Sequence, residues 1–402
     1  MNLQKAIEKA TEAMALYGKQ REELDEANFN KVLAAMRKSK ITDAHLKSSS
    51  GYGYNDRGRD ALEEVWAEVF KAEAALVRQQ IVSGTHAIYL ALAGNLLPGD
   101  ELLALGTPYD TLQTIIGHKK HVPGSLSELG IKYREIPFNS SPDDIVASIR
   151  PQTKIFSIQR SKGYTWRESL SIAKIGEITK AIKKHHPEVI VFVDNCYGEF
   201  VEKEEPIEAG ADLCAGSLIK NAGGGLTPCG GYIAGKKALI ERSAAKLTTP
   251  GAGQEVGPSL MDQRIYYQGL FMAPQVVGEA IRGSVYAATL MQELGFKVLP
   301  TPQAHRTDIV QAICLETKER LLAFCQGIQK YGPVDSFVLP VPNLMPGYNH
   351  PIVMAAGTFI QGSSIELSAD GPITPPYNVF LQGGLNRYHT KTALNNTLRE
   401  IM

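Results

Sequence analysis

Hydrophobic and polar positions repeat with two different periods along most of the chain. From residue 74 to about residue 235, short apolar runs typical of buried strands alternate with helical patterns. The run "VIVFVDN" (189–195), for example, follows the helical pattern "SIAKIGEITKAIKKHH" (171–186). Such alternation predicts an α/β fold, in which helices cover both faces of a mostly parallel sheet.

The two ends of the chain have other patterns. Residues 1–46 predict two helices, the second at about residues 25–39, and the first carries Ile7, Ala10, Met14 and Tyr17 on one face. A long helix is expected over 271–295, followed by a smaller α+β domain. We therefore expect an N-terminal helical segment (1–50), a large domain (51–270) and a connecting helix with a small domain (271–402).

Composition narrows the class of protein. The 402 residues contain 42 Lys+Arg and 42 Asp+Glu, so no global charge favours nucleic acid or a membrane surface as a partner. No apolar run reaches about 18 residues, and charges near the start argue against a signal peptide. The five cysteines form no CxxC pair, and no metal-ligand cluster is visible. These features predict a cytoplasmic protein without a metal site.

The segment "SLIKNAGGG" (217–225) is the first candidate for chemistry. Its order does not match a phosphate-binding P-loop, where lysine follows the glycines and precedes Ser or Thr. An imine-forming Lys220 fits better, in a desolvated pocket that lowers its pKa. The glycines would then let the backbone approach a flat cofactor. The alternative is an ordinary surface lysine at a strand end.

Pyridoxal phosphate (PLP) needs such a lysine together with an acid for its ring nitrogen and a phosphate cradle. Asp194 ends a buried strand, where a carboxylate could hold the ring proton. Ser83, Gly84 and Thr85 lie between a strand and a helix, whose first N–H groups would bind phosphate. Ser217 could add a hydroxyl. A helix-capping role remains the alternative for Asp194 and for Ser83.

In this order the motifs resemble the fold-type I PLP enzymes, in particular the cysteine/methionine-metabolism family. The resemblance covers about residues 50–235 and includes "SGTHA", "TPYDTLQ" and "VDNCYGEF…GADLCAGSLIK". "QRSKGYTWRESL" and "GSLIKNAGGGLTPCGGYIAG" are similar to its methionine gamma-lyase-like, aluminium-resistance branch. The resemblance implies a seven-stranded-type sheet, PLP as cofactor, and Tyr109 stacking on the ring and assisting catalysis. It also implies a homo-oligomer, expected to be a dimer of dimers, in which Tyr54 and Arg57 reach a neighbouring subunit's phosphate.

Two positions depart from the family pattern, and three others leave a choice open. Ile219 stands where the family has threonine, and Glu366 stands where it has the arginine for the substrate carboxylate. Arg160 and Arg167 are the candidates to bind that carboxylate instead, since a guanidinium forms a two-pronged pair with it. A structural ion pair is the alternative for each. His86 could also cover the ring, but packing or capping is favoured for it.

The expected function is therefore a PLP-dependent carbon–sulfur lyase. Its substrate would be a sulfur amino acid of the cystathionine, methionine or cysteine type, cleaved by α,β- or α,γ-elimination, with Lys220 as general base. An aminotransferase, an aldolase-type enzyme and a PLP-binding protein with little turnover remain alternatives, since fold alone does not fix function.

Overall fold

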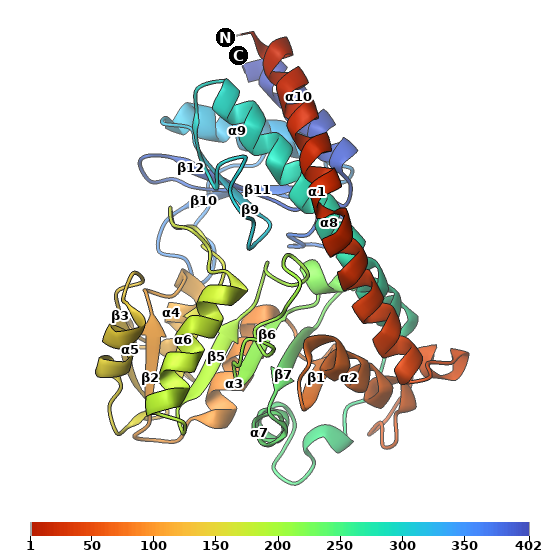
Figure 1. Ribbon diagram of the computed structural model, residues 1–402, viewed down its shortest axis with the longest axis vertical. Helices are drawn as coiled ribbons and strands as arrows, with labels where there is room; N and C mark the ends of the chain where they lie inside the picture. Colours follow the sequence, from red (N-terminus) through yellow and green to blue (C-terminus); the bar gives the residue numbers. More distant parts are fainter. Residues whose placement is uncertain (1, 402) are drawn as a thin grey trace.

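The computed structural model describes residues 2–401, which form a large and a small sheet with helices around them (Figure 1). The large sheet has seven strands in the order β1-β7-β6-β5-β4-β2-β3. Only β7 runs antiparallel to its neighbours. The strands of the large sheet are β1 (Ala74–Arg78), β2 (Glu101–Leu105), β3 (Lys132–Ile136), β4 (Thr153–Gln159), β5 (Ile190–Asp194), β6 (Leu213–Ser217) and β7 (Gly231–Gly235). The predicted mostly parallel sheet is thus confirmed.

Helices cover both faces of this sheet, because its central strands are apolar on both sides. Val191 and Val193 of β5 face one layer, and Ile190 and Phe192 face the other. The helices of the large part are α2 (Arg57–Phe70), α3 (Gly84–Asn95), α4 (Asp110–Ile116), α5 (Pro142–Ser148), α6 (Ile172–His185) and α7 (Lys237–Leu247). Parallel sheets need such cover, since neither face can meet water.

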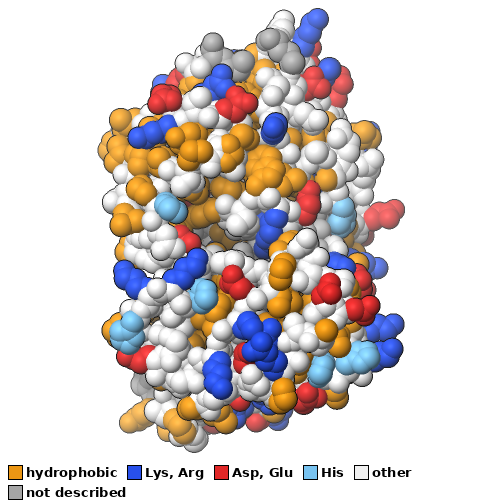
Figure 2. Space-filling model, turned by 90° about the vertical axis from the view of Figure 1, so that its left-hand side faces the viewer, with side chains coloured by type: hydrophobic (Ala, Val, Ile, Leu, Met, Phe, Trp, Pro, Cys, Tyr) orange, Lys and Arg blue, Asp and Glu red, His pale blue; other side chains and the backbone are white. Residues whose placement is uncertain are grey.

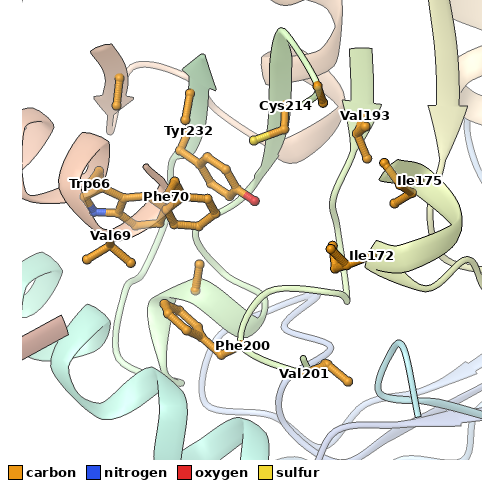
Figure 3. Close-up of a cluster of buried hydrophobic side chains, with 14 of the residues drawn as sticks. Trp66, Val69, Phe70, Ile172, Ile175, Val193, Phe200, Val201, Cys214 and Tyr232 are labelled. Carbon is orange, nitrogen blue, oxygen red and sulfur yellow. The ribbon is translucent and has the colours of Figure 1, made fainter. Parts of the chain in front are cut away.

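The layer beneath α2 and α6 is built around aromatic rings. Figure 3 shows Trp66 and Phe70 of α2 beside Tyr232 of β7. Val193 of β5 and Ile175 of α6 lie farther along the same layer. The Trp66 and Tyr232 ring centroids are 4.7 Å apart, within the range of favourable aromatic pairs. This layer fixes the strands whose carboxyl ends carry the candidate site.

The small sheet is antiparallel, with the strand order β10-β11-β12-β9-β8. Two helices, α9 (Lys318–Lys330) and α10 (Arg387–Ile401), pack on one of its faces. The other face carries Val310, Ala312 and Phe380, against which Tyr164 and Tyr197 of the large part pack. Its strands are β8 (Lys297–Leu299), β9 (Val310–Cys314), β10 (Ile352–Ala355), β11 (Ser368–Pro372) and β12 (Asn378–Gln382).

Two long helices join the parts. The first, α1 (Leu3–Lys38), packs along the second, α8 (Arg264–Glu293), on one side of the molecule (Figure 1). Three short 3₁₀ turns, Asp43–Leu46, Asn221–Gly223 and Gly253–Glu255, complete the structure. No helix among residues 2–401 has the length and apolarity needed to cross a bilayer.

The prediction of two helices in residues 1–46 is wrong, because α1 is continuous over 36 residues. A single glycine costs a helix only about 1 kcal/mol and does not by itself end it. Gly18 also has a packing reason, since a Cβ there would lie 3.1 Å from Nε of Arg282 in α8. The α8 helix likewise begins at Arg264, ahead of the predicted residue 271, and continues through Pro274.

Two buried polar side chains of α1 attach it to the segment after β5. Arg21 donates to the carbonyl oxygens of Val201 (2.9 Å) and Phe200 (3.0 Å), and Asn28 also donates to Phe200 O (3.0 Å). The Arg21 guanidinium also forms an ion pair with Asp25, whose Oδ1 lies 2.7 Å from Nε of Arg21. These bonds satisfy carbonyl groups that would otherwise be buried without partners.

Arg21→Ala should lower the free energy of unfolding by about 2 kcal/mol, because the buried Val201 carbonyl loses its side-chain donor and Phe200 O keeps only Asn28. The matched control is Lys31→Ala, which removes one exposed hydrogen bond to Lys203 O and should change stability by less than about 0.5 kcal/mol. Urea unfolding followed by circular dichroism measures both. Equal midpoints for the two variants would show that Arg21 does not anchor α1.

Candidate active site

The residues predicted to carry chemistry converge on the carboxyl edge of the large sheet. Asp194 ends β5, Ser217 ends the neighbouring β6, and Lys220 follows three residues later. The Ser83 turn comes after β1, and Tyr109 comes after β2. Carboxyl ends of parallel strands are where α/β sheets bind their ligands.

Lys220 lies among acidic groups rather than in a purely apolar pocket. Its Nζ is 4.0 Å from the centroid of the Tyr197 ring, a favourable position for a cation. Burial lowers the pKa of Lys220, but Cys196, Tyr197, Asp194 and Tyr109 raise it, and the net shift is well above the usual value. The predicted lowering of its pKa is therefore wrong for the amine in this state, because nearby acids outweigh desolvation.

Asp194 is buried and has one oxygen left for a ligand. Its Oδ1 accepts from the Cys196 N–H at 3.1 Å, whereas no second N–H, hydroxyl or cation among residues 2–401 pairs with its Oδ2, and the Cys196 thiol is the neighbouring side-chain group. Burial raises the pKa of this carboxyl, and the charge of Lys220 works in the opposite direction. A buried carboxylate with one unpaired oxygen fits a protonated ring nitrogen as its partner.

The turn 83–85 opens α3 next to Ser217. Ser83 is the N-cap residue of α3, and its Oγ accepts from the His86 N–H at 3.1 Å. A Cβ on Gly84 would lie 2.9 Å from Cβ of Ser217, so only glycine lets the helix start approach that strand end. The N–H groups of Gly84 and Thr85 have no acceptor within residues 2–401, as expected for the first helical turn. Together with Ser217 they fit an anion such as phosphate.

Tyr109 is the N-cap residue of α4, and its N–H donates to Gln159 Oε1 at 3.2 Å. Burial raises the pKa of its phenol well above the usual value, and the charges of Asp194 and Cys196 add to the effect. The phenol therefore keeps its proton at neutral pH. His86 accepts from the Val82 N–H through Nδ1 at 3.2 Å, which is the capping role favoured from the sequence.

The glycines after Lys220 are required by close packing of the backbone, and their predicted approach to a cofactor stays a prediction. A Cβ on Gly223 would lie 1.7 Å from Leu218 O, and one on Gly224 would lie 2.3 Å from Gly269 O of α8. These glycines let the loop fold against its own strand end and against α8. They serve close backbone packing behind the lysine, so their approach to a cofactor is not needed to explain them.

Arg160 is fully buried and its guanidinium is already paired. It donates to Asn195 Oδ1 (2.7 Å) and Glu202 Oε2 (2.8 Å), and it lies 3.8 Å from Glu205. These contacts argue against the prediction that Arg160 binds a substrate carboxylate. They support the alternative, a structural ion pair, because a buried guanidinium needs such partners.

Arg167 is also engaged by the protein. Its Nη atoms donate to the carbonyl oxygens of Gln159 (3.1 Å), Ser161 (2.6 Å) and Glu168 (2.9 Å). Its guanidinium stacks 4.0 Å from the centroid of the Phe138 ring. Carboxylate binding by Arg167 stays a prediction, and it would require some of these bonds to be exchanged.

Glu366 does not act as a replacement ligand in the site. Its two oxygens accept from the N–H groups of Phe359 (2.9 Å) and Ile360 (3.0 Å) and so hold a loop of the small sheet. Arg387, another arginine of this part, forms an ion pair with Glu279 of α8.

Tyr54 and Arg57 lie at the exposed start of α2. The Tyr54 ring stacks on Tyr52 with centroids 5.5 Å apart, and both rings are mostly exposed. Arg57 is exposed, and no ion pair or hydrogen bond of its side chain is found within residues 2–401. Their predicted contact with a neighbouring subunit's phosphate stays a prediction.

Several residues near Lys220 were missed, although most lie inside motifs that drew attention. Cys196 and Tyr197 follow Asp194 by two and three residues, and Tyr164 lies in "SKGYTW". Asp370, in "IELSADG", accepts from the Tyr164 hydroxyl at 2.9 Å and brings the small sheet to the site. The signal that could have found Asp370 is an acidic residue inside an otherwise small and apolar strand.

Comparison with known proteins agrees with this geometry. A family model described as methionine gamma-lyase matches residues 3–402. Protein YnbB of Bacillus subtilis is 49% identical over 390 residues, which are 96% of this chain and 93% of that protein. A solved structure from Listeria monocytogenes, of a proposed cystathionine beta-lyase involved in aluminum resistance, has a TM-score of 0.96 and 48% identity and covers 99% of this chain and 100% of its own.

A more distant structure shows how widely the fold is shared. The pyridoxal-5'-phosphate dependent protein YhfS from Escherichia coli has a TM-score of 0.64 at 18% identity, over 94% of this chain and 95% of its own. No group of three or more His, Cys, Asp or Glu side chains in residues 2–401 is arranged to hold a metal ion.

Gly224→Ala should destabilise the protein by about 3 kcal/mol or more, because the new Cβ meets α8 and φ is +56°. Gly251→Ala is the matched control: φ there is +88°, but a Cβ would have no atom within 4 Å. It should cost only the backbone strain, about 1–2 kcal/mol. Thermal unfolding measures the difference, and equal losses would mean that the loop behind Lys220 can yield to α8.

Proposed function

The chain belongs to the methionine gamma-lyase family, and we propose that it is a PLP-dependent lyase that breaks a carbon–sulfur bond of an amino acid. The observation that carries this proposal is the meeting of three groups at one sheet edge. They are the amine of Lys220, the unpaired Oδ2 of Asp194 and the free N–H groups at the start of α3. A partly buried amine, a buried carboxylate and an anion cradle fit what this cofactor requires.

Each group has an assignment that follows from its chemistry. Lys220 Nζ would hold the cofactor covalently, and Asp194 Oδ2 would accept a hydrogen bond from the protonated ring nitrogen. The N–H groups of Gly84 and Thr85 and the Ser217 hydroxyl would bind the phosphate, and Tyr109 would lie against the ring. When bound, the cofactor supplies an electron sink that acidifies the α-carbon of an attached amino acid.

The side chains of the protein then move the protons. Lys220 Nζ would take the proton from the α-carbon as general base. The carbon–sulfur bond breaks with its electron pair on sulfur, and the Tyr109 hydroxyl, which keeps its proton at neutral pH, would protonate the departing thiolate. The aromatic face of Tyr197 would steady the ammonium that forms on Lys220.

For the finer reaction we propose α,β-elimination from an S-substituted cysteine, such as cystathionine. The support is the name of the Listeria monocytogenes relative, which covers the whole chain at 48% identity. An α,γ-elimination would need a further proton transfer at the β-carbon by a second base. An aminotransferase would yield a keto acid without releasing a thiol, so the product pattern separates these reactions.

Wild-type protein should release thiol, ammonia and keto acid from S-substituted cysteines, and Lys220→Ala should lower that rate by more than about 10³-fold, since it lacks the general base and the covalent link. Borohydride reduction followed by peptide mass spectrometry should place the cofactor on Lys220 in wild type. Lys236→Ala, which changes an exposed lysine paired with Asp212, is the control and should keep both label and rate. Wild type that carries no label on Lys220 would contradict the proposal.

We also propose that the protein works as a homo-oligomer, at least a dimer, with Tyr54 and Arg57 completing a neighbouring subunit's phosphate site. The support is their exposure and the unpaired guanidinium of Arg57. Large apolar side chains are exposed as well, in a run of the small part that includes Phe337, Leu339, Val341 and Leu344. Hydrophobic side chains gather over the upper half of one face of the molecule (Figure 2). Exposed apolar patches of this kind mark protein interfaces.

Arg57→Ala should weaken cofactor binding by about tenfold or more, because a phosphate loses a charged partner, while the mass from light scattering stays that of the oligomer. Arg264→Ala is the control: this exposed arginine pairs with Asp262, and its loss should leave cofactor affinity unchanged. A wild-type monomer with full cofactor affinity would refute the shared site.

A further inference from the structure

We infer that Asp370 recognises a positively charged group at the far end of the substrate side chain, so that the preferred substrates are S-substituted cysteines with a distal ammonium. The inference rests on the proposed function and concerns the same site. It starts from a buried carboxylate of the small sheet that faces the sheet edge where Lys220 lies.

Asp370 is placed by the register of the small sheet. It pairs with Phe380 across β11 and β12, and Gln382 lies two residues further on the same face of β12. This is the face that packs against Tyr164 and Tyr197 of the large part. The carboxylate therefore points toward the large sheet and away from the α9 and α10 layer.

The partners of Asp370 are neutral and use one of its oxygens. Oδ2 accepts from the Tyr164 hydroxyl (2.9 Å) and from Gln382 Nε2 (2.7 Å). Oδ1 receives no hydrogen bond, and no cation lies within ion-pair distance, among residues 2–401. With only 8% of its surface exposed, this carboxylate is not compensated by bulk water.

The position of Asp370 relative to Lys220 decides which part of a substrate it could contact. Burial raises the pKa of Asp370 to about 6, while Tyr164, Gln382 and the charge of Lys220 act to lower it. Lys220 Nζ lies 4.0 Å from the centroid of the Tyr197 ring, and Tyr197 packs with Tyr164 on the face of the small sheet that carries Asp370. A substrate whose α-carbon is served by Lys220 would extend its side chain into the space beside Asp370.

Aromatic rings complete a site suited to a cation. The Tyr164 ring lies 6.0 Å from the Tyr348 ring and 5.4 Å from the Phe380 ring. Tyr348 belongs to a loop tied to α4 by a bond from the Asn349 N–H to Asp110 Oδ2 at 3.0 Å. A buried carboxylate lined by tyrosines attracts an ammonium more strongly than an alkyl group of the same size.

A matched pair of substrates tests the inference directly. S-(2-Aminoethyl)-L-cysteine and S-propyl-L-cysteine differ only in an ammonium replacing a terminal methyl group. The holoenzyme should prefer the aminoethyl compound in kcat/KM, and Asp370→Asn should reduce that preference by about 10- to 100-fold, chiefly through the aminoethyl compound. Glu366→Gln is the control, since both oxygens of Glu366 already accept backbone N–H groups, and it should leave the ratio unchanged.

Two other variants and a binding measurement separate the competing outcomes. If Asp370 only orients Tyr164, Asp370→Asn and Tyr164→Phe will both slow the two compounds equally, and the inference is overturned. Under the inference, Tyr164→Phe retains most of the preference for the ammonium.

Calorimetric binding of both compounds gives the same ratio without turnover. Absence of turnover alone would count against the lyase proposal. Equal affinities for the two compounds in wild type would count against the role of Asp370.

Discussion

The geometry of the site depends on the pairing of the buried Arg160 guanidinium with its neighbours. A charge with no exposure must be paired, and its partners belong to the segment that follows β5. Asn195, next to Asp194, accepts from it, and Glu202 links it to the start of α6 through the Ile172 N–H at 2.9 Å. A Cβ on Gly198 would lie 2.5 Å from its Nη1, so the turn closes around the guanidinium. This network of protein contacts thereby holds Asp194 at the sheet edge.

The α1 helix also holds the segment after β5, through hydrogen bonds to residues 200–202. Arg21 and Asn28 bind the carbonyl oxygens of residues 200–202, on the other side of the turn that carries Asp194. The N-terminal helix is therefore part of the support of the site, although it contributes no group to the chemistry. This arrangement follows a general pattern, in which groups that act on a ligand are fixed by a buried shell behind them.

The sequence predicted those parts of the structure that depend on local pattern. Buried strands such as 190–194, and the order of Ser83, Asp194 and Lys220 along the chain, were enough to place these residues at one sheet edge. What could not be predicted depends on contacts between distant residues. The sequence indicates Arg160 as a possible binding group for a substrate carboxylate, but in the fold Glu202 and Glu205 pair with it. The pKa of Lys220 likewise depends on which acids the fold brings near it, such as Tyr109 from the loop after β2. Asp370 is 150 residues from Lys220 along the chain.

The long α1 helix has a mechanical consequence for substrate selection. Its first turns pack through Ile7, Ala10 and Met14 into the core of the small sheet, while Arg21 and Asn28 hold the large part. A helix of 36 residues is about 54 Å long and resists bending, so it works as a splint across the two parts. Swinging one sheet away from the other would have to break one of these attachments. If Asp370 binds the distal ammonium as proposed, the fixed separation of Lys220 and Asp370 would select substrates by side-chain length as well as by charge.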